Sequence, residues 1–168
     1  GLVATPITAT RVLVNLSEPS RAPAVAERMC DGVGLLRAEL MVLEALDSSH
    51  PRALLEEGRG DEVVDRLADG IETIAHAFAP RPVTYRTIDF RTNEFRGLRG
   101  GDRFEPTEAN PMLGLRGALR YLHDPSVFAL ELRALRTVYQ RGSRNVHVML
   151  PFVRSARELA GCVALMEQ

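Results

Sequence analysis

Four short, largely apolar runs divide the chain, and they cover residues 12–16, 33–36, 83–88 and 146–150. Each run is rich in valine, leucine or isoleucine and is shorter than an ordinary helix. Runs that are apolar at consecutive positions are typical of strands buried on both faces, as in a parallel sheet. The pattern therefore predicts four buried strands.

Segments between these runs repeat apolar residues with the helical period. Residues 17–19 give a helix-start signal after the first strand. Pro80 and Pro82 end a long helix, and Gly142 ends another. The expected apolar helix faces are Ala22, Val25, Ala26 and Met29, then Val63, Leu67, Ile71, Ile74 and Phe78, then Phe128, Leu132, Leu135 and Tyr139, and finally Leu159, Val163 and Met166.

Two further stretches show no clear strand pattern. A long polar stretch with His50-Pro51 follows the second strand, before the long helix. Residues 90–110 are rich in glycine and charge and predict a long loop, which in a compact domain is usually functional or disordered. A helix is expected to begin near residues 113–116, in front of the one that follows Asp124-Pro125.

The order of elements is strand then helix, repeated four times. This order predicts an α/β fold with a parallel sheet and helices packed outside it. Two architectures fit, an open doubly wound sheet and a partial (β/α)8 barrel of the TIM type with about four β-α units. No Gly-x-Gly-x-x-Gly fingerprint follows the first strand, which argues against dinucleotide binding.

Composition narrows the classes of function. The 168 residues suffice for one domain with a sizeable core, and no apolar run approaches the roughly 20 residues needed to span a membrane. The net charge of −1 implies neither a nucleic acid nor a membrane partner. All 21 basic residues are arginine, so no lysine chemistry is available. Cys30 and Cys162 predict free thiols in a cytoplasmic protein.

Arginines stand where a parallel α/β fold binds its ligands, at the carboxyl ends of strands and in the loops after them. Arg37 ends the second strand, Arg86 lies in the third, and Arg116 follows in a loop flanked by glycines. A guanidinium presents a rigid fork of donors that matches carboxylate and phosphate oxygens. We therefore predict that these three bind a small, multiply charged anion. We expect ordinary surface ion pairs of Arg11, Arg52, Arg133 and Arg136.

Three carboxylates accompany these arginines, namely Glu39, Asp89 and Glu94. Carboxylates can hold Mg²⁺ together with phosphate oxygens, or they can orient the arginines. We favour the orienting role and expect no metal ligand in this chain. His147 lies within a strand and is expected to be structural, and we find neither a Ser/His/Asp order nor a Cys/His pair.

Five sequence motifs resemble one known family. They are GVGLLRAE at 32–39, HPRAL at 50–54, YRTIDFRTNEF at 85–95, FEP at 104–106 with NPMLGLRG at 110–117, and PFVR at 151–154. In order and spacing they resemble the phosphoenolpyruvate synthases (pyruvate, water dikinases) of the PEP-utilising enzyme family, where PEP is phosphoenolpyruvate. The resemblance runs from about Thr10 to the end, and the long form of the loop after Arg86 favours the synthases over their relatives.

The resemblance implies a (β/α)8 barrel that binds PEP or pyruvate with Mg²⁺, in a cytoplasmic, ATP-dependent transferase of gluconeogenesis. In such enzymes ATP phosphorylates a histidine on a separate domain, and the phosphohistidine passes its phosphoryl group to pyruvate in the barrel. Arg37 and Arg86 match the family's substrate-binding arginines, and Arg116 matches a third arginine that contacts phosphate.

The same resemblance gives the expected division of the chain. Residues 1–10 are expected to be a linker, and residues 11–168 the first half of the PEP/pyruvate-binding barrel. The family's Mg²⁺ ligands, a substrate loop and a cysteine proton donor are expected after residue 168, and the phosphohistidine and ATP-grasp domains before Gly1. This piece alone is therefore expected to be inactive.

Two alternatives come from other classes of protein. Four strands leave two open sheet edges, so a non-catalytic half-barrel that self-associates into a homo-oligomer and binds small anions is possible. A nucleic-acid binder that uses arginine is the other, but the near-zero net charge and few aromatic residues argue against it.

Overall fold

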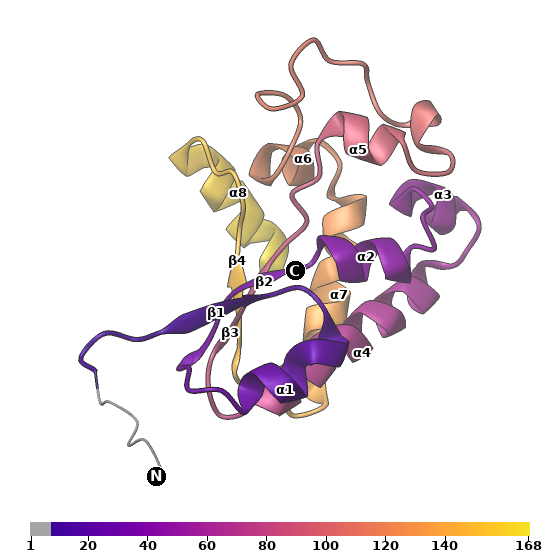
Figure 1. The fold of residues 1–168 in the computed structure, drawn as a ribbon. Coiled ribbons are helices and arrows are strands. Elements are labelled where there is room, and N and C mark those ends of the chain that lie inside the picture. Colours follow the sequence, from indigo (N-terminus) through magenta and orange to yellow (C-terminus); the bar gives the residue numbers. More distant parts are fainter. Residues whose placement is uncertain (1–7) are drawn as a thin grey trace.

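The computed structural model describes residues 8–168, and a parallel sheet of four strands forms its centre. The strands lie in the order β1-β2-β3-β4, so each pairs with its neighbour in sequence (Figure 1). Their bounds are Leu13–Leu16 for β1, Gly32–Arg37 for β2, Val83–Arg86 for β3 and Val146–Met149 for β4. The expected α/β fold is confirmed. Most of the expected linker, residues 1–7, lies outside the described residues.

Helices connect every pair of neighbouring strands. They are η1 Pro19–Arg21 and α1 Ala22–Ala26 after β1, then α2 Glu39–Ala45, α3 Pro51–Glu56 and α4 Gly60–Phe78 after β2, then α5 Thr92–Arg96, η2 Gly101–Arg103, α6 Ala118–His123 and α7 Pro125–Gln140 after β3, and α8 Ala156–Met166 after β4. Side-chain caps begin α3, α7 and α8. His50, Asp124 and Ser155 accept the amide hydrogens of Arg52, Ser126 and Glu158 there, as caps do for the free amides of a first turn.

Helices cover only one face of the sheet. On that face, side chains of neighbouring strands form rows such as Val14, Val33 and Val83, which pack into the main core with α4 and α7. The opposite face carries Leu13, which is 44% exposed, and the exposed His147. A doubly wound sheet has helices on both faces and a reversal in strand order. A sheet that is covered on one face, with its strands in sequence order, is that of a partial barrel. The structure therefore favours the partial barrel over the doubly wound sheet.

Some predicted elements have different bounds. α2 lies directly after β2, where the sequence showed only a polar stretch, and it buries Met41 and Val42. α5 lies within the predicted loop 90–110 and buries Phe95. Both helices have seven residues or fewer, which is too short for a periodic pattern to show. α6 begins at Ala118 rather than near 113–116, after Gly117 with its positive φ of 56°.

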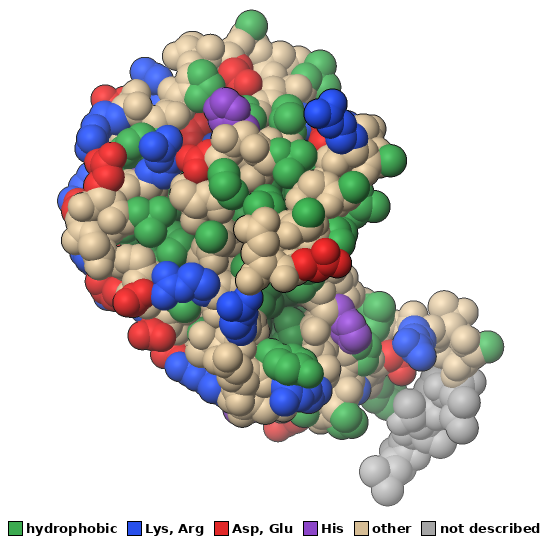
Figure 2. All heavy atoms as spheres, turned by 180° about the vertical axis from the view of Figure 1, so that it is seen from behind, with side chains coloured by type: hydrophobic (Ala, Val, Ile, Leu, Met, Phe, Trp, Pro, Cys, Tyr) green, Lys and Arg blue, Asp and Glu red, His purple; other side chains and the backbone are tan. Residues whose placement is uncertain are grey.

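Other predictions failed at helix surfaces. α1 ends at Ala26, so Met29 lies beyond it and is 63% exposed. Tyr139, on the predicted apolar face of α7, is 59% exposed, and the three apolar residues predicted for α8 are exposed as well. Figure 2, seen from behind, shows hydrophobic side chains reaching the surface across this side of the molecule. The helical period was correct, but no element of residues 8–168 covers these faces.

β3 ends at Arg86, two residues before the end of the predicted strand. The amide of Thr87 still donates to the Met149 carbonyl on β4, at 3.1 Å. The amide of Ile88 leaves the sheet and donates to the carboxylate of Glu131 on α7, at 2.9 Å. A side chain therefore takes over from the strand ladder just before Asp89.

No helix among residues 8–168 combines the length and the apolar character needed to cross a membrane.

Candidate functional site

A hollow of about 570 Å³ lies at the carboxyl ends of the strands, within the size range of small-molecule sites. All six residues selected from the sequence line it. The lining is Ser17, Arg37, Glu39, Leu40, Arg86, Asp89, Phe90, Arg91, Glu94, Met112 and Arg116. Strand register explains part of this convergence, because Arg37 of β2 stands directly opposite Arg86 of β3.

Arg86 is the arginine at the centre of this set. Its Nη2 donates to Glu39 Oε1 at 2.6 Å, and its Nη1 lies 3.9 Å from Asp89 Oδ2. Its Nε is buried and has no hydrogen-bond partner. The side chain of Arg37 beside it is exposed and makes no hydrogen bond or ion pair with any of residues 8–168. One guanidinium is thus held in place by carboxylates, while its neighbour is unpaired.

Arg116 comes from the long loop but is nearly buried, at 9% exposure. It donates to Asp89 through both Nε, at 3.0 Å to Oδ1, and Nη2, at 2.8 Å to Oδ2. Its Cζ lies 4.3 Å from the centroid of the Phe152 ring. Two parallel hydrogen bonds and an aromatic neighbour hold a guanidinium in one orientation. Only Nη1 is not engaged with Asp89, and it lies 3.6 Å from Met112 Sδ.

Arg91 is a fourth arginine in the hollow, and sequence reasoning missed it. It forms a two-point ion pair with Glu94, at 2.9 and 3.1 Å, and its Nη1 lies 3.4 Å from Met112 Sδ. The Arg91 hydrogen bonds lower the pKa of Glu94 and outweigh the effect of burial, which would raise it. The signal in the sequence was its place two residues after Asp89, in a loop that leaves a strand end.

The three carboxylates each bond an arginine, as the orienting role requires. Glu39 accepts from Arg86, Asp89 from Arg116, and Glu94 from Arg91. Within residues 8–168 no group of three or more histidine, cysteine or acidic side chains is placed to hold a metal ion. The hollow as built from these residues therefore offers cationic forks and no ready cation site.

A buried polar network supports the hollow from the helix side. Tyr85 O–H donates to Glu131 Oε1 at 2.8 Å, and Ile88 N–H donates to the same oxygen. Burial raises the pKa of Glu131 to about 8, although the hydrogen bonds from Tyr85 and Ile88 act in the opposite direction. The Tyr121 hydroxyl bonds Thr87 Oγ1 at 2.8 Å. These contacts fix the backbone just before Asp89.

A second buried network fixes the long loop. Glu105 accepts both Nη atoms of Arg120, at 2.7 and 2.9 Å, and lies 3.0 Å from His50 Nε2. Hydrogen bonds from His50 and Arg120 lower the pKa of Glu105, against burial, which would raise it. His50 stacks on Phe104 with ring centroids 5.0 Å apart. Two of the sequence motifs, around His50 and Glu105, thereby join into one structural unit.

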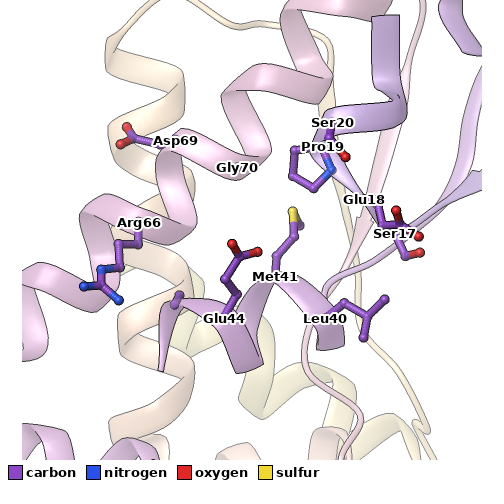
Figure 3. Close-up of a pocket in the computed structure, with 11 residues that line it drawn as sticks. Ser17, Glu18, Pro19, Ser20, Leu40, Met41, Glu44, Arg66, Asp69 and Gly70 are labelled. Carbon is purple, nitrogen blue, oxygen red and sulfur yellow. The ribbon is translucent and has the colours of Figure 1, made fainter. Parts of the chain in front are cut away.

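A neighbouring hollow lies between η1, α2 and α4, and it shares Ser17 and Leu40 with the first (Figure 3). Figure 3 shows Met41 of α2 pointing toward Pro19 and Gly70. A Cβ at Gly70 would lie only 3.2 Å from Met41 Sδ, so the missing side chain lets these elements pack closely. We assign no ligand to this hollow, because Arg66, the one arginine that lines it, forms an ion pair with Glu62 outside it.

The residues assigned to structural roles lie away from the arginines of the first hollow. Arg52 pairs with Asp124 at 3.4 Å, and Arg133 pairs with Asp61 at 2.5 Å, as predicted for surface arginines. Arg11 and Arg136 are exposed but form no ion pair with any of residues 8–168, so the ion pairs expected of these two are not found there. Cys30 and Cys162 are free thiols, as expected.

Comparison with known proteins matches residues 2–168 to the family described as PEP-utilising enzyme, PEP-binding domain. The chain belongs to the PEP-utilising enzymes. A probable phosphoenolpyruvate synthase of Staphylothermus marinus is 44% identical over 167 residues, which cover 97% of this chain and 20% of the relative. That of Pyrococcus horikoshii is 48% identical, and the phosphoenolpyruvate synthase of Pyrococcus furiosus 47%, each over 95% of this chain and 20% of the relative.

The chain thus spans about a fifth of the length of these curated relatives. This chain therefore contains the PEP-binding domain of the PEP-utilising enzymes, and here that domain has a parallel sheet with a hollow at the strand ends. The resemblance drawn from the sequence motifs is confirmed at the level of the family.

Proposed function

We propose that this chain supplies the phosphate-binding part of the PEP/pyruvate site in a phosphoenolpyruvate synthase, which makes PEP from pyruvate and ATP through a phosphohistidine. One observation carries the proposal, namely the convergence of Arg37, Arg86 and Arg116 on one hollow at the strand ends. PEP carries a carboxylate and a phosphate, and guanidinium forks match both groups.

Each arginine has a distinct part in the proposed site. Arg86 and Arg116, already oriented by carboxylates, present their remaining N–H groups to the phosphate oxygens. Fixed donors of this kind stabilise the charge on a transferring phosphoryl group without rearranging during the reaction. Arg37, which is unpaired within residues 8–168, meets the ligand as a full positive charge.

Mg²⁺ belongs to the proposed reaction, where it neutralises phosphate charge. Its protein ligands are proposed to lie outside this chain. The donor set of the hollow supports this, because Glu39, Asp89 and Glu94 are each occupied by an arginine. Their proposed role is to hold the guanidinium groups in position.

The partners of this site follow from the proposed reaction. A phosphohistidine domain and an ATP-grasp domain of the same enzyme would deliver the phosphoryl group, and the chain alone would not turn over substrate. The free thiols Cys30 and Cys162 fit a reducing compartment, so we place the enzyme in the cytoplasm, in gluconeogenesis.

Calorimetric titration with PEP and Mg²⁺ tests the proposed site directly. The full chain should bind PEP, and Arg86→Ala should weaken binding by roughly 10- to 100-fold, because it removes charge-assisted hydrogen bonds. Arg86→Lys keeps the charge without the fork and should recover only part of the affinity.

Arg133→Ala is the matched control, because Arg133 forms a surface ion pair with Asp61. It should leave PEP affinity unchanged. Equal affinities of the Arg86→Ala and Arg133→Ala variants would refute the assignment of Arg86, and no heat of PEP binding to the unsubstituted chain would refute the proposed function.

A non-catalytic half-barrel that self-associates is the alternative, and the uncovered sheet face favours it. Such a protein would use the same arginines for small anions in general. Competition between PEP and inorganic phosphate separates the two functions, since only a PEP site prefers PEP.

A further inference from the structure

Three residues after the end of β4 lies a residue with a strained backbone that the proposed function does not use. Phe152 follows Pro151 with a positive φ of 51°, in the left-handed region that side chains rarely adopt. Phe152 is also 39% exposed, so burial of its ring does not explain its presence. Strain of this kind persists where surrounding contacts require it, and it gathers at functional sites.

The Phe152 ring carries two guanidinium groups. Arg116 Cζ lies 4.3 Å from the ring centroid, and Arg154 Cζ lies 4.6 Å from it. A cation over an aromatic face is attracted by the ring's quadrupole. One ring therefore stabilises two cations that would repel each other, and one of them is the candidate phosphate-binding residue Arg116.

Hydrogen bonds on both sides of Phe152 tie this segment to the loop that carries Arg116. Arg154 Nη2 donates to the Gly114 carbonyl at 2.7 Å, and Ala118 N donates to the Pro151 carbonyl at 3.1 Å. A Cβ at Gly117 would lie 2.7 Å from Phe152 Cβ, so only glycine allows this close approach. The loop and the end of β4 are thus held on both sides of Arg116.

We infer that Phe152 is a positioning residue for Arg116, an inference that rests on the proposed PEP site. Phe152 does not line the hollow, so it acts through Arg116. Its ring holds the guanidinium plane so that Nε and Nη2 stay on Asp89 while Nη1 remains for the phosphate. The left-handed backbone is what brings the ring over Arg116.

Opposite effects on stability and on binding distinguish this role from simple packing. Phe152→Gly relieves the strained φ, so its melting temperature should be unchanged or raised. It loses the ring, so PEP should bind roughly 3- to 10-fold more weakly, the range expected for a cation–aromatic contact. Phe152→Leu should weaken PEP binding as much, and Phe152→Tyr should restore it.

Val153→Ala is the matched control, because Val153 is equally exposed at the next position and does not line the hollow. It should leave PEP affinity unchanged. A Phe152→Leu variant with the PEP affinity of the unsubstituted chain would overturn the inference.

A second measurement does not depend on PEP. Stacking on an aromatic ring shifts the NMR signal of the Arg116 Nε–H proton upfield, and Arg116→Lys identifies that signal. The shift should vanish in Phe152→Leu and persist in Phe152→Tyr. A signal that does not move in Phe152→Leu overturns the positioning role. If the Arg116 signal moves in Phe152→Leu but the unsubstituted chain binds no PEP, the positioning role is supported and only the proposed function is refuted.

Discussion

Glu131 is a buried acid that accepts hydrogen bonds from Tyr85 and Ile88 on one carboxyl oxygen, and its other oxygen has no hydrogen-bond partner within residues 8–168. Burial raises its pKa to about 8, so the folded chain holds it protonated at neutral pH. In the unfolded chain its pKa returns to about 4.3. The stability that it contributes is therefore complete below about pH 4 and is lost as the pH rises toward 8.

Glu131→Gln should remove this dependence while keeping an oxygen for Tyr85 and Ile88. Relative to the unsubstituted chain, its free energy of unfolding should rise by roughly 1.4 kcal/mol per pH unit between about pH 5 and 8. Urea unfolding at several pH values measures the difference. Glu44→Gln, an exposed substitution on α2, is the control and should give a constant difference. A constant difference for Glu131→Gln would show that the acid is not protonated in the fold.

Single residues also show how far sequence reasoning reached. Arg37 and Arg86 could be found because parallel strands bring their carboxyl ends to one edge, a rule that needs no coordinates. Arg116 was found from its glycine-flanked loop and from the motif at 110–117. Arg91 lies in the same hollow but follows an irregular loop, whose path the rule does not give. Glu131 lies at mid-helix, 46 residues from Tyr85, and only the packing of α7 against the sheet reveals its contact.

At the scale of elements, a buried ion pair and several hydrogen bonds hold the long loop between α5 and α6 in place. Glu105 and Arg120 are each 5% exposed, and Arg120 also donates to the Leu115 carbonyl at 2.9 Å. Glu108 accepts from Thr92 Oγ1 at 2.7 Å and from Leu115 N at 2.9 Å. These bonds hold the loop between α5 and α6, which rises above the sheet (Figure 1) and carries Arg116.

Glu105→Gln should therefore loosen the loop as well as lower stability. It leaves the buried Arg120 charge uncompensated, which typically costs about 3–5 kcal/mol. Hydrogen exchange of the amides in residues 97–117 should accelerate more than that of α4. Asp61→Asn, which breaks the exposed pair with Arg133, should change the free energy of unfolding by no more than about 1 kcal/mol. Equal losses for the two variants would mean that the Glu105 network contributes no more than a surface pair.

Elements could be predicted where they are long or strongly apolar. α4 was visible because its nineteen residues repeat the helical period several times. α2 and α5 were missed because short helices depend on tertiary packing rather than on pattern. The predicted third strand was too long because Thr87 and Ile88 favour strands, whereas the hydrogen bond from Ile88 N–H to the Glu131 carboxyl group turns the backbone out of the ladder.

At the scale of the whole molecule, the sheet is open within residues 8–168. β1 and β4 each pair on one side only, and the face opposite the helices is uncovered. Edge strands with exposed apolar side chains favour pairing with another chain. Next to β1, Val12 is 54% exposed, and in β1 Leu13 is 44% exposed.

The isolated chain should therefore self-associate as its concentration rises, and light scattering should show the increase in mass. Val12→Lys should reduce association, because a lysine beside an edge strand opposes pairing. Ala24→Lys adds the same charge on the exposed surface of α1 and should have no such effect. A monomer at all concentrations, or equal reduction by both variants, would exclude pairing at this edge.

The unpaired state of Arg37 has a consequence for kinetics. A charge in exposed surroundings acts over a Debye length, about 8 Å in physiological salt, and so reaches an anion before contact. Arg86 and Arg116 are partly neutralised by carboxylates, and their influence is confined to the bound state. Under the proposed function, we expect Arg37 to set how fast an anion arrives, and Arg86 and Arg116 to set how long it stays.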